Sequence, residues 1–235
     1  MLSGSISTYD ILQYIVRVGI IFLILPLHEC AHGFVAYKLG DRTAKNQGRL
    51  TLNPIAHIDY VGALLMLIVG FGWAKPVPVN ARNFKNPKAG MAVTALAGPV
   101  SNLLAAIISG LIYYTIVTIL VSSNSAKVIG LAVMLHTNVS WMKYVLLFFQ
   151  FLMMINISLA VFNLIPIPPL DGSKILMAFL PDRLIFKLYQ YQFYFSIALF
   201  VLIMIGGVSS LLLPVQKWLF SGISWLTALP FSWAW

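Results

Sequence analysis

The chain has 235 residues, of which 60% are hydrophobic and only 9% are charged, and its mean hydropathy is +0.90. Soluble globular domains carry about 25% charged residues, so this composition excludes a soluble protein with an ordinary core. A membrane-spanning helix needs about 20 apolar residues, and the length therefore allows several spans in one bundle. The composition predicts an all-α polytopic membrane protein that is embedded in a lipid bilayer.

The net charge of +9 comes largely from a basic stretch between the first two long apolar runs, which contains Lys38, Arg42, Lys45, Arg49, Lys75, Arg82, Lys85 and Lys88. Aromatic residues do not interleave with these cations as they do in single-strand binders, so we expect no nucleic-acid partner. Basic loops instead mark the cytoplasmic side of membrane proteins, where they face anionic headgroups.

Long apolar runs predict about four main transmembrane helices. We expect them at Ile11–Leu39, Gly90–Val121, Trp141–Ile165 and Tyr191–Leu213. The basic residues of the connecting loops place residues 40–89 and 170–190 in the cytoplasm and both termini outside. The chain is thus expected to be a multi-pass protein of a cell membrane.

Three shorter segments are expected to lie at the membrane surface or to re-enter it. Val61–Trp73 is too short to span, so it is predicted to be re-entrant or interfacial. Lys127–Leu135 is shorter still and is expected to cap the far side. Pro214–Trp235 is rich in tryptophan, which favours an interfacial helix. We therefore expect one domain over residues 1–213 and an interfacial C-terminal tail over 214–235.

Residues His28, Glu29 and His32 form an H-E-x-x-H motif inside the first apolar run. Two imidazoles at i and i+4 lie on one face of a helix, where both can bind the same metal ion. A glutamate directly after the first histidine can reach a water at that metal. Ionisable residues in a span are costly and usually functional, so the motif predicts a hydrolytic zinc site inside the membrane.

The third expected span ends at a cluster of prolines, Pro166, Pro168 and Pro169, just before Asp171. Proline cannot continue a regular helix, and the backbone groups freed by such a break are tolerated in a membrane only against protein or a water-filled cavity. The expected topology brings Asp171 to the same face of the membrane as His28 and His32.

Two asparagines and one histidine are further candidates. In the second span, Gly98 permits close helix approach and Pro99 opens the hydrogen-bond ladder, one turn before Asn102. Asn163 has a comparable position on the third span. Either amide is catalytic or serves as interhelical glue. His57 lies in a loop near the site and is either a structural residue or a residue that orients a ligand or gates the site.

These motifs together resemble the site-2 proteases, a family of intramembrane zinc metalloproteases. The resemblance covers about residues 20–180 and is to the compact form, without PDZ or cystathionine-β-synthase (CBS) modules. It rests on His28-Glu29-x-x-His32, Ala97-Gly98-Pro99-x-x-Asn102 and Asn163–Gly172, and it extends to Gly48–Pro54 and Gly72–Val79.

The resemblance implies that His28, His32 and Asp171 bind one Zn²⁺ per chain and that Glu29 is the general acid and base. It also implies a small membrane-associated β-sheet, built from 48–53 and 77–79, near the substrate. A prokaryotic cell membrane is the expected location, with the active site opening toward the cytoplasm.

The predicted reaction is hydrolysis of a peptide bond within or near the transmembrane helix of a single-span membrane protein, as in regulated intramembrane proteolysis. Asn163 is the first candidate and Asn102 the second for a donor to the tetrahedral oxygen or to the substrate backbone. The alternative is a catalytically silent membrane scaffold that binds client transmembrane helices. A zinc transporter is a third hypothesis, but it would need polar residues along the whole bilayer path. The sequence specifies neither the substrate nor the oligomeric state.

Overall fold

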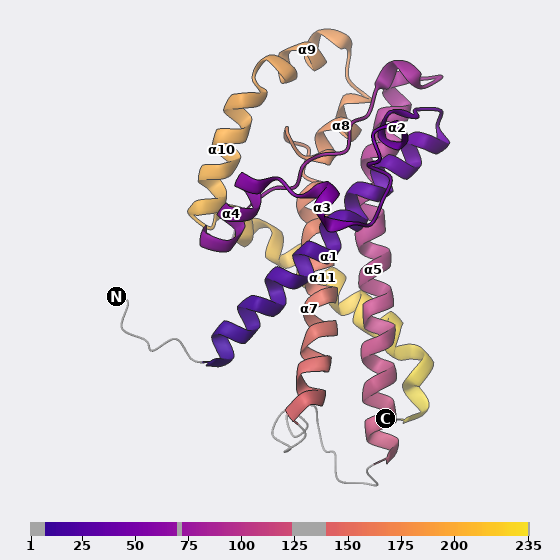
Figure 1. Cartoon of the computed structure of the whole chain (residues 1–235), viewed down its shortest axis with the longest axis vertical. Helices are drawn as coiled ribbons and strands as arrows, with labels where there is room; N and C mark the ends of the chain where they lie inside the picture. The colour runs from indigo at the N-terminus through magenta and orange to yellow at the C-terminus, as the bar shows by residue number, and fades with distance from the viewer. Residues whose placement is uncertain (1–7, 70–71, 124–139, 235) are drawn as a thin grey trace.

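The computed structural model describes residues 8–69, 72–123 and 140–234 of the chain, and this part is built of helices (Figure 1). Long helices α1 and α5 carry the first two motifs, the third motif follows the end of the long helix α7, and shorter helices surround one end of the three long ones. The elements are α1 (Thr8–Lys38), α2 (Thr43–Asn46), α3 (Pro54–His57), α4 (Tyr60–Val69), η1 (Ala81–Asn83), α5 (Pro87–Ser123), α7 (Ser140–Asn163), α8 (Asp171–Met177), α9 (Asp182–Gln190), α10 (Gln192–Met204), α11 (Gly207–Ala228) and η2 (Leu229–Ala234).

Helices α5 and α7 contain segments that are long and apolar enough to cross a membrane, Pro87–Ser122 and Tyr144–Asn163. A third crossing is formed if α9 and α10, which are bent by 60° to one another, act as one span. The expected first span corresponds to α1, a helix of 31 residues. These helices agree with a polytopic membrane protein, as the composition predicts.

The expected fourth span, Tyr191–Leu213, is not one helix, and this prediction is wrong. Helix α10 ends at Met204, and Gly206 adopts a left-handed conformation with φ of 75° before α11 begins. Glycine has no Cβ and enters this conformation without strain, so the chain can change direction there. Figure 1 shows α10 and α11 running in different directions.

The core lies between α5, α7 and α11. One cluster of buried side chains joins the three helices and contains Ala106, Met153, Ile157, Val161 and Ile223. Small residues such as Ala106 allow helices in a membrane to approach closely. Helix α11 crosses the expected division at 213/214 without a break, and its Ile223 belongs to this cluster. The division between residues 1–213 and 214–235 stays a prediction.

The expected small β-sheet is not found: the part of the chain that the structure describes contains no strand and one isolated antiparallel bridge, between Ile58 and Ala74. The physical reason lies in the donors of the segment after Ala74. Pro76 and Pro78 have no N–H to give to a neighbouring strand. The N–H of Val77 donates to the side chain of Glu29 instead, so this extended segment is held by a side chain of α1.

Gly62, near the start of α4, lies against Trp73. A Cβ on Gly62 would overlap the carbonyl oxygen of Trp73. The re-entrant or interfacial location of Val61–Trp73 stays a prediction. The segment Lys127–Leu135 lies outside the described residues.

Asp41 ties the end of α1 to the chain that leads into α5. Its buried carboxylate accepts hydrogen bonds from the backbone N–H of Thr43 at 3.0 Å, from the backbone N–H of Asn80 at 2.7 Å and from Nδ2 of Asn83 at 2.6 Å. Burial opposes its ionisation, but these donors outweigh burial and hold the pKa of Asp41 below its ordinary value. The α1–α5 connection is therefore fixed just after the C-terminal end of α1.

Candidate active site

The three candidate metal ligands meet between α1 and the start of α8. The Nε2 atoms of His28 and His32 are 3.0 Å apart, and they lie 3.2 and 3.1 Å from Oδ2 of Asp171. All three side chains are buried. The structure thus brings together the three residues that the sequence singles out, although Asp171 lies far from the histidines along the chain.

The other polar atom of each ligand side chain decides how the ligand atom is oriented. The Nδ1–H of His32 donates to the carbonyl oxygen of Thr94 at 2.7 Å, which leaves the lone pair on Nε2. Lys174 Nζ contacts Oδ1 of Asp171 at 3.1 Å, so Oδ2 is the oxygen that faces the histidines. Nδ1 of His28 is buried and has no hydrogen-bond partner within the described ranges. Two of the three ligands are therefore held in the direction that a metal requires.

The spacing of these atoms fits zinc. Tetrahedral coordination at about 2.0–2.2 Å separates nitrogen and oxygen ligands by about 3.3 Å, within a few tenths of an ångström of the observed separations. Two histidines and one carboxylate also leave a fourth position free, which is the pattern of catalytic rather than structural zinc sites. The group can therefore hold one metal ion and keep a place open beside it.

The close approach of α5 to α1 depends on Gly98. A Cβ at this position would overlap the rings of both His28 and His32. Only glycine lets the backbone of α5 pass directly over the two imidazoles, and the next residue, Pro99, lies inside α5 and is also buried. The expectation that Gly98 permits close helix approach is confirmed: α5 packs against the rings of His28 and His32 at this position.

Asp171 is presented by a tight turn after the end of α7. The segment from Leu164 to Leu170 contains three prolines and is not helical, and α8 begins at Asp171 itself. Gly172 packs against the carbonyl oxygens of Leu164 and Ile165, where a Cβ would overlap the backbone. The hydroxyl of Ser173 donates to the carbonyl oxygen of Leu170 at 2.6 Å. The predicted break therefore exists, and it points Asp171 back toward α1.

Glu29 lies beside the ligand group and is fixed by the extended segment after Ala74. Its Oε2 accepts a hydrogen bond from the backbone N–H of Val77 at 2.8 Å. The Val77 side chain is buried and would touch a Cβ on Gly33, one turn after Glu29 on α1. Sequence reasoning placed Val77 in the expected sheet near the substrate but did not predict its contact with Glu29, and it missed Thr94. The reason is that backbone groups make both contacts, and backbone groups leave no side-chain signature.

The remaining candidates are Asn102, Asn163 and His57, and none of them makes a hydrogen bond to the three ligands among the described residues. Asn102 is fully buried, one turn after Gly98, and both of its amide atoms are without a partner in the described part of the chain. Asn163 is the last residue of α7, is only partly buried, and gives one N–H to the carbonyl oxygen of Leu159 at 3.0 Å. His57 contacts Arg49 and Thr51, and no contact joins it to the three ligands within the described residues.

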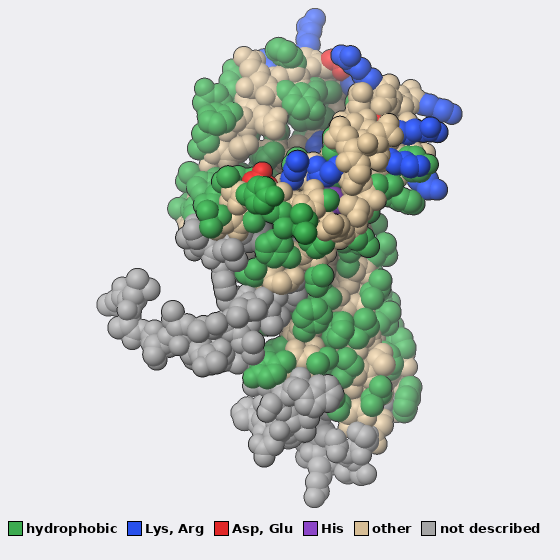
Figure 2. Space-filling view, viewed as in Figure 1, with side chains coloured by type: hydrophobic (Ala, Val, Ile, Leu, Met, Phe, Trp, Pro, Cys, Tyr) green, Lys and Arg blue, Asp and Glu red, His purple; other side chains and the backbone are tan. Residues whose placement is uncertain are grey.

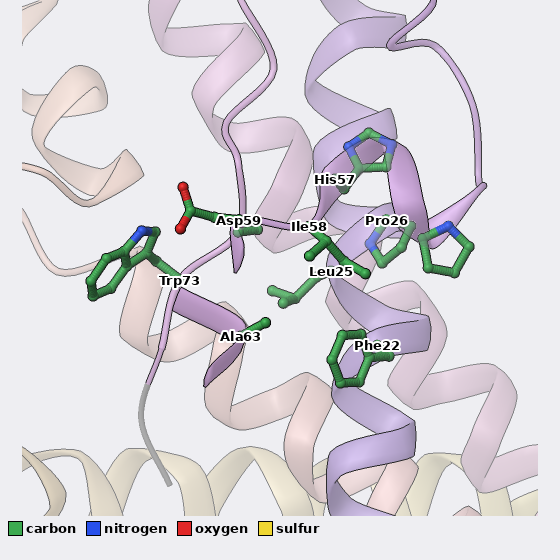
Figure 3. A pocket seen from close by; sticks show the side chains of 10 residues that line it. Phe22, Leu25, Pro26, His57, Ile58, Asp59, Ala63 and Trp73 are labelled. Carbon is green, nitrogen blue, oxygen red and sulfur yellow. The ribbon is translucent and has the colours of Figure 1, made fainter. Parts of the chain in front are cut away.

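A small hollow lies beside α1 and not at the ligand group. Figure 3 shows it between Phe22, Leu25 and Pro26 of α1 on one side and Ala63 and Trp73 on the other. Its lining is mainly apolar, and none of the three ligand residues lines it. The chemistry of the centre is therefore not located in this hollow.

Comparison with known proteins agrees with the geometry. The model of peptidase family M50 matches residues 16–206. The chain is 39% identical over 189 residues to the Bacillus subtilis (strain 168) protein named "Putative zinc metalloprotease YwhC", a match that covers 80% of each chain. It is 25% identical over 178 residues to "Putative zinc metalloprotease Rip2" of Mycolicibacterium smegmatis (strain ATCC 700084 / mc(2)155), which covers 69% of this chain and 59% of that protein. No solved structure matches the chain.

The family match includes the H-E-x-x-H turn, the Gly98 contact and Asp171, which are the parts that the geometry brings together. Zinc is also the metal in the names of both relatives. The chain belongs to peptidase family M50, the site-2 proteases, and is a membrane zinc metalloendopeptidase.

Proposed function

We propose that this protein hydrolyses a peptide bond within or near the transmembrane helix of a single-span membrane protein, as in regulated intramembrane proteolysis. The observation that carries the proposal is the buried group of His28, His32 and Asp171 with Glu29 beside it. This group packs directly against Gly98 of α5, one of the two helices that are long and apolar enough to cross a membrane.

We assign the roles of the four residues from their geometry. His28, His32 and Asp171 hold the metal, and Glu29 is the general base and then the general acid. Zinc, when bound, supplies Lewis acidity that lowers the pKa of water and polarises a carbonyl group. Glu29 accepts the proton from the attacking water and delivers it to the leaving amine. The Val77 N–H keeps the Glu29 carboxylate oriented for this transfer.

A donor for the developing negative charge is proposed among the asparagines. Asn163 stands at the end of α7, directly before the turn that presents Asp171, and it keeps one amide N–H beyond its bond to Leu159. That position supports Asn163 as the first candidate for contact with substrate. The complete burial of Asn102 supports a role inside the protein, with substrate contact as the second alternative.

The substrate helix must unwind before cleavage, because its peptide groups are hydrogen-bonded internally. The segment from Ala74 to Asn80 is extended and lies against Glu29. The N–H groups of Lys75, Val77 and Asn80 already donate within the protein, and Pro76 and Pro78 have none, so this segment offers few donors for strand-like pairing. An unwound substrate would therefore have to be held beside it mainly through the carbonyl groups of the segment.

The active site is proposed to open toward the cytoplasm of a prokaryotic cell. Figure 2 shows that Lys and Arg side chains gather at one end of the molecule, the end where α2 and α9 lie in Figure 1. Basic residues are retained on the cytoplasmic side of membrane proteins. The exposed basic residues of this end are Lys38, Arg42, Lys45, Lys75, Arg82, Lys85, Lys88, Arg183 and Lys187.

We also propose that residues 1–213 form a single intramembrane metalloprotease domain and that residues 214–235 form its interfacial C-terminal tail. Trp218, Trp225 and Trp233 are strongly exposed, which supports contact of this part with the headgroup region. Helix α11 links the two parts, so the tail is attached rigidly to the domain.

The test is co-expression with candidate single-span membrane proteins. The wild-type chain is compared with Glu29→Gln, and new N-termini are identified by mass spectrometry. New N-termini inside or next to a transmembrane segment that appear with the wild type and disappear with Glu29→Gln support the proposal. Client proteins that are captured by both forms and cleaved by neither would favour the alternative, a catalytically silent scaffold.

A further inference from the structure

Arg49 is a buried cation whose burial the proposed reaction does not explain. It is only 8% exposed, and no carboxylate lies within ion-pair distance of it among the described residues. Burying a charge without an opposite charge is costly unless hydrogen bonds compensate. Nη2 of Arg49 donates to the carbonyl oxygen of Lys75 at 2.6 Å, and Nη2 also lies 3.5 Å from Nδ1 of His57. The guanidinium therefore contacts two neutral acceptors.

His57 makes this arrangement rigid. It is 2% exposed, and its Nε2–H donates to the carbonyl oxygen of Thr51 at 2.8 Å, which leaves the lone pair of Nδ1 directed at Arg49. The backbone N–H of Lys75 donates to the carbonyl oxygen of His57 at 2.9 Å. Lys75 is thus held at its N–H by the His57 backbone and at its carbonyl by Arg49. Figure 3 shows His57 close to Pro26 of α1.

Lys75 lies two positions before Val77, whose backbone N–H contacts Glu29. Pro76 stands between them, and its ring fixes φ near about −65°, so a shift at Lys75 passes to Val77 with little loss. Val77 N–H lies 2.8 Å from Oε2 of Glu29. A continuous set of contacts therefore runs from the guanidinium through the Lys75 carbonyl and the Val77 amide to the Glu29 carboxylate.

We infer that Arg49 is a positioning residue for Glu29: it fixes the Lys75 carbonyl and thereby the place of the Val77 amide that holds the carboxylate. The inference rests on the proposed role of Glu29 in peptide hydrolysis. Arginine suits the task because both contacts come from one nitrogen, Nη2, whose N–H groups are held in fixed directions by the planar guanidinium. A lysine, with a compact ammonium, would not reproduce the pair of contacts.

Hydrogen exchange tests the positioning directly and needs no substrate. Between Lys75 and Val79 only Val77 has an N–H, because its two neighbours are prolines. Exchange of that amide is followed by mass spectrometry on the detergent-purified chain, in the wild type, Arg49→Ala and Arg49→Gln. We expect the Val77 amide to exchange about 10- to 100-fold faster in both variants, because its hydrogen bond to a charged group is weakened. Arg82→Ala, which removes an exposed arginine of the same basic end, is the matched control and should match the wild type.

Kinetics and metal content give the second measurement. Arg49→Gln should retain about one zinc per chain and lose about 10- to 100-fold in kcat at little cost in KM, because Glu29 is displaced while the ligands are not. Arg49→Lys should fall between wild type and Arg49→Gln. In a Val77→Pro background, which lacks the amide, adding Arg49→Gln should cost little more, since both changes remove the same contact.

Unchanged exchange at Val77 in both Arg49 variants would overturn the inference, whether or not the protein cleaves anything. Full additivity of Arg49→Gln and Val77→Pro in kcat would also overturn it. Absence of Glu29-dependent cleavage by the wild type would instead contradict the proposed function, while the exchange result would still decide whether Arg49 positions Val77.

Discussion

At the residue scale, the centre combines side chains that supply chemistry with backbone groups that aim them. His32 is aimed by the carbonyl of Thr94 and Glu29 by the amide of Val77. Both supporting groups come from elements distant in sequence, α5 and the extended segment before it. The side chains could be predicted, because ionisable residues and a proline break are costly inside an apolar run and are usually retained there for a function. Their backbone partners could not, because every residue carries a carbonyl and nearly every residue an amide N–H.

Zinc content is the first prediction at this scale. The convergence of His28, His32 and Asp171 predicts one zinc per chain in protein purified in detergent, measured by elemental analysis. The triple variant His28→Ala/His32→Ala/Asp171→Ala should contain essentially none. Near-stoichiometric zinc in that variant would contradict the assignment of the ligands.

The second prediction concerns Gly98. Gly98→Ala places a methyl group against both imidazoles, so α5 must move away or the rings must turn. Misplaced ligands and disturbed supporting contacts typically cost about 10- to 100-fold in metal affinity, and we expect a loss of this size in competition with a chelator. Gly222→Ala is the matched control, because a Cβ there has nothing within 4 Å, and it should bind zinc like the wild type. Equal affinity of the two variants would show that α5 does not lie on the histidines.

The third prediction is the effect of Glu29→Gln. The amide keeps the size of the side chain but cannot accept a proton, so cleavage should fall by about 10²- to 10⁴-fold while zinc binding is retained. Turnover and zinc content are measured on the same preparation. Activity within about tenfold of the wild type would mean that another group is the base.

At the element scale, what could be predicted depended on whether local sequence or distant contacts decide the structure. Helices α5 and α7 follow from long apolar runs. The break between α10 and α11 does not, because the run from Tyr191 to Leu213 is largely apolar and the packing of α11 on α5 and α7 decides its direction. The expected sheet failed for a similar reason, since carboxylates of other segments take the donors of residues 77 and 80.

Asp41 gives the element-scale prediction, because it joins the end of α1 to the segment before α5. Its pKa is lowered in the folded protein, so its contribution to stability is complete above the ordinary carboxyl pKa of about 4 and is lost as the pH falls through the folded-state pKa. Asp41→Asn replaces the carboxylate by an amide, whose NH₂ group cannot accept a hydrogen bond from the buried donors. The change should lower the free energy of unfolding by about 1–3 kcal/mol at neutral pH. Thermal unfolding in detergent should therefore show a gap in Tm between wild type and variant that narrows on acidification below about pH 4. A gap that is constant with pH would contradict the role of the charge.

At the scale of the whole molecule, the distribution of charge and the position of the centre point to the same side of the membrane. The ligands lie toward the end that carries α2 and α9, and most of the exposed Lys and Arg residues of the described chain gather at that end, with Lys217 of α11 as an exception (Figure 2). The other end of α5 is apolar around Ile119 and Leu120. We therefore predict that the basic end faces the cytoplasm when a bilayer accommodates the two apolar helices.

Cysteine accessibility tests this topology in a Cys30→Ala background, which removes the single native cysteine. One new cysteine is introduced per variant, at Ser122 near the end of α5 or at Lys85 or Asp182 of the basic end, and all three positions are exposed. A membrane-impermeant thiol reagent applied to intact cells should label only Ser122→Cys, and all three should react after the membrane is permeabilised. Labelling of Lys85→Cys without Ser122→Cys would invert the topology. The centre would then open to the outside, and the substrates would have to present their cleavage site at the external face.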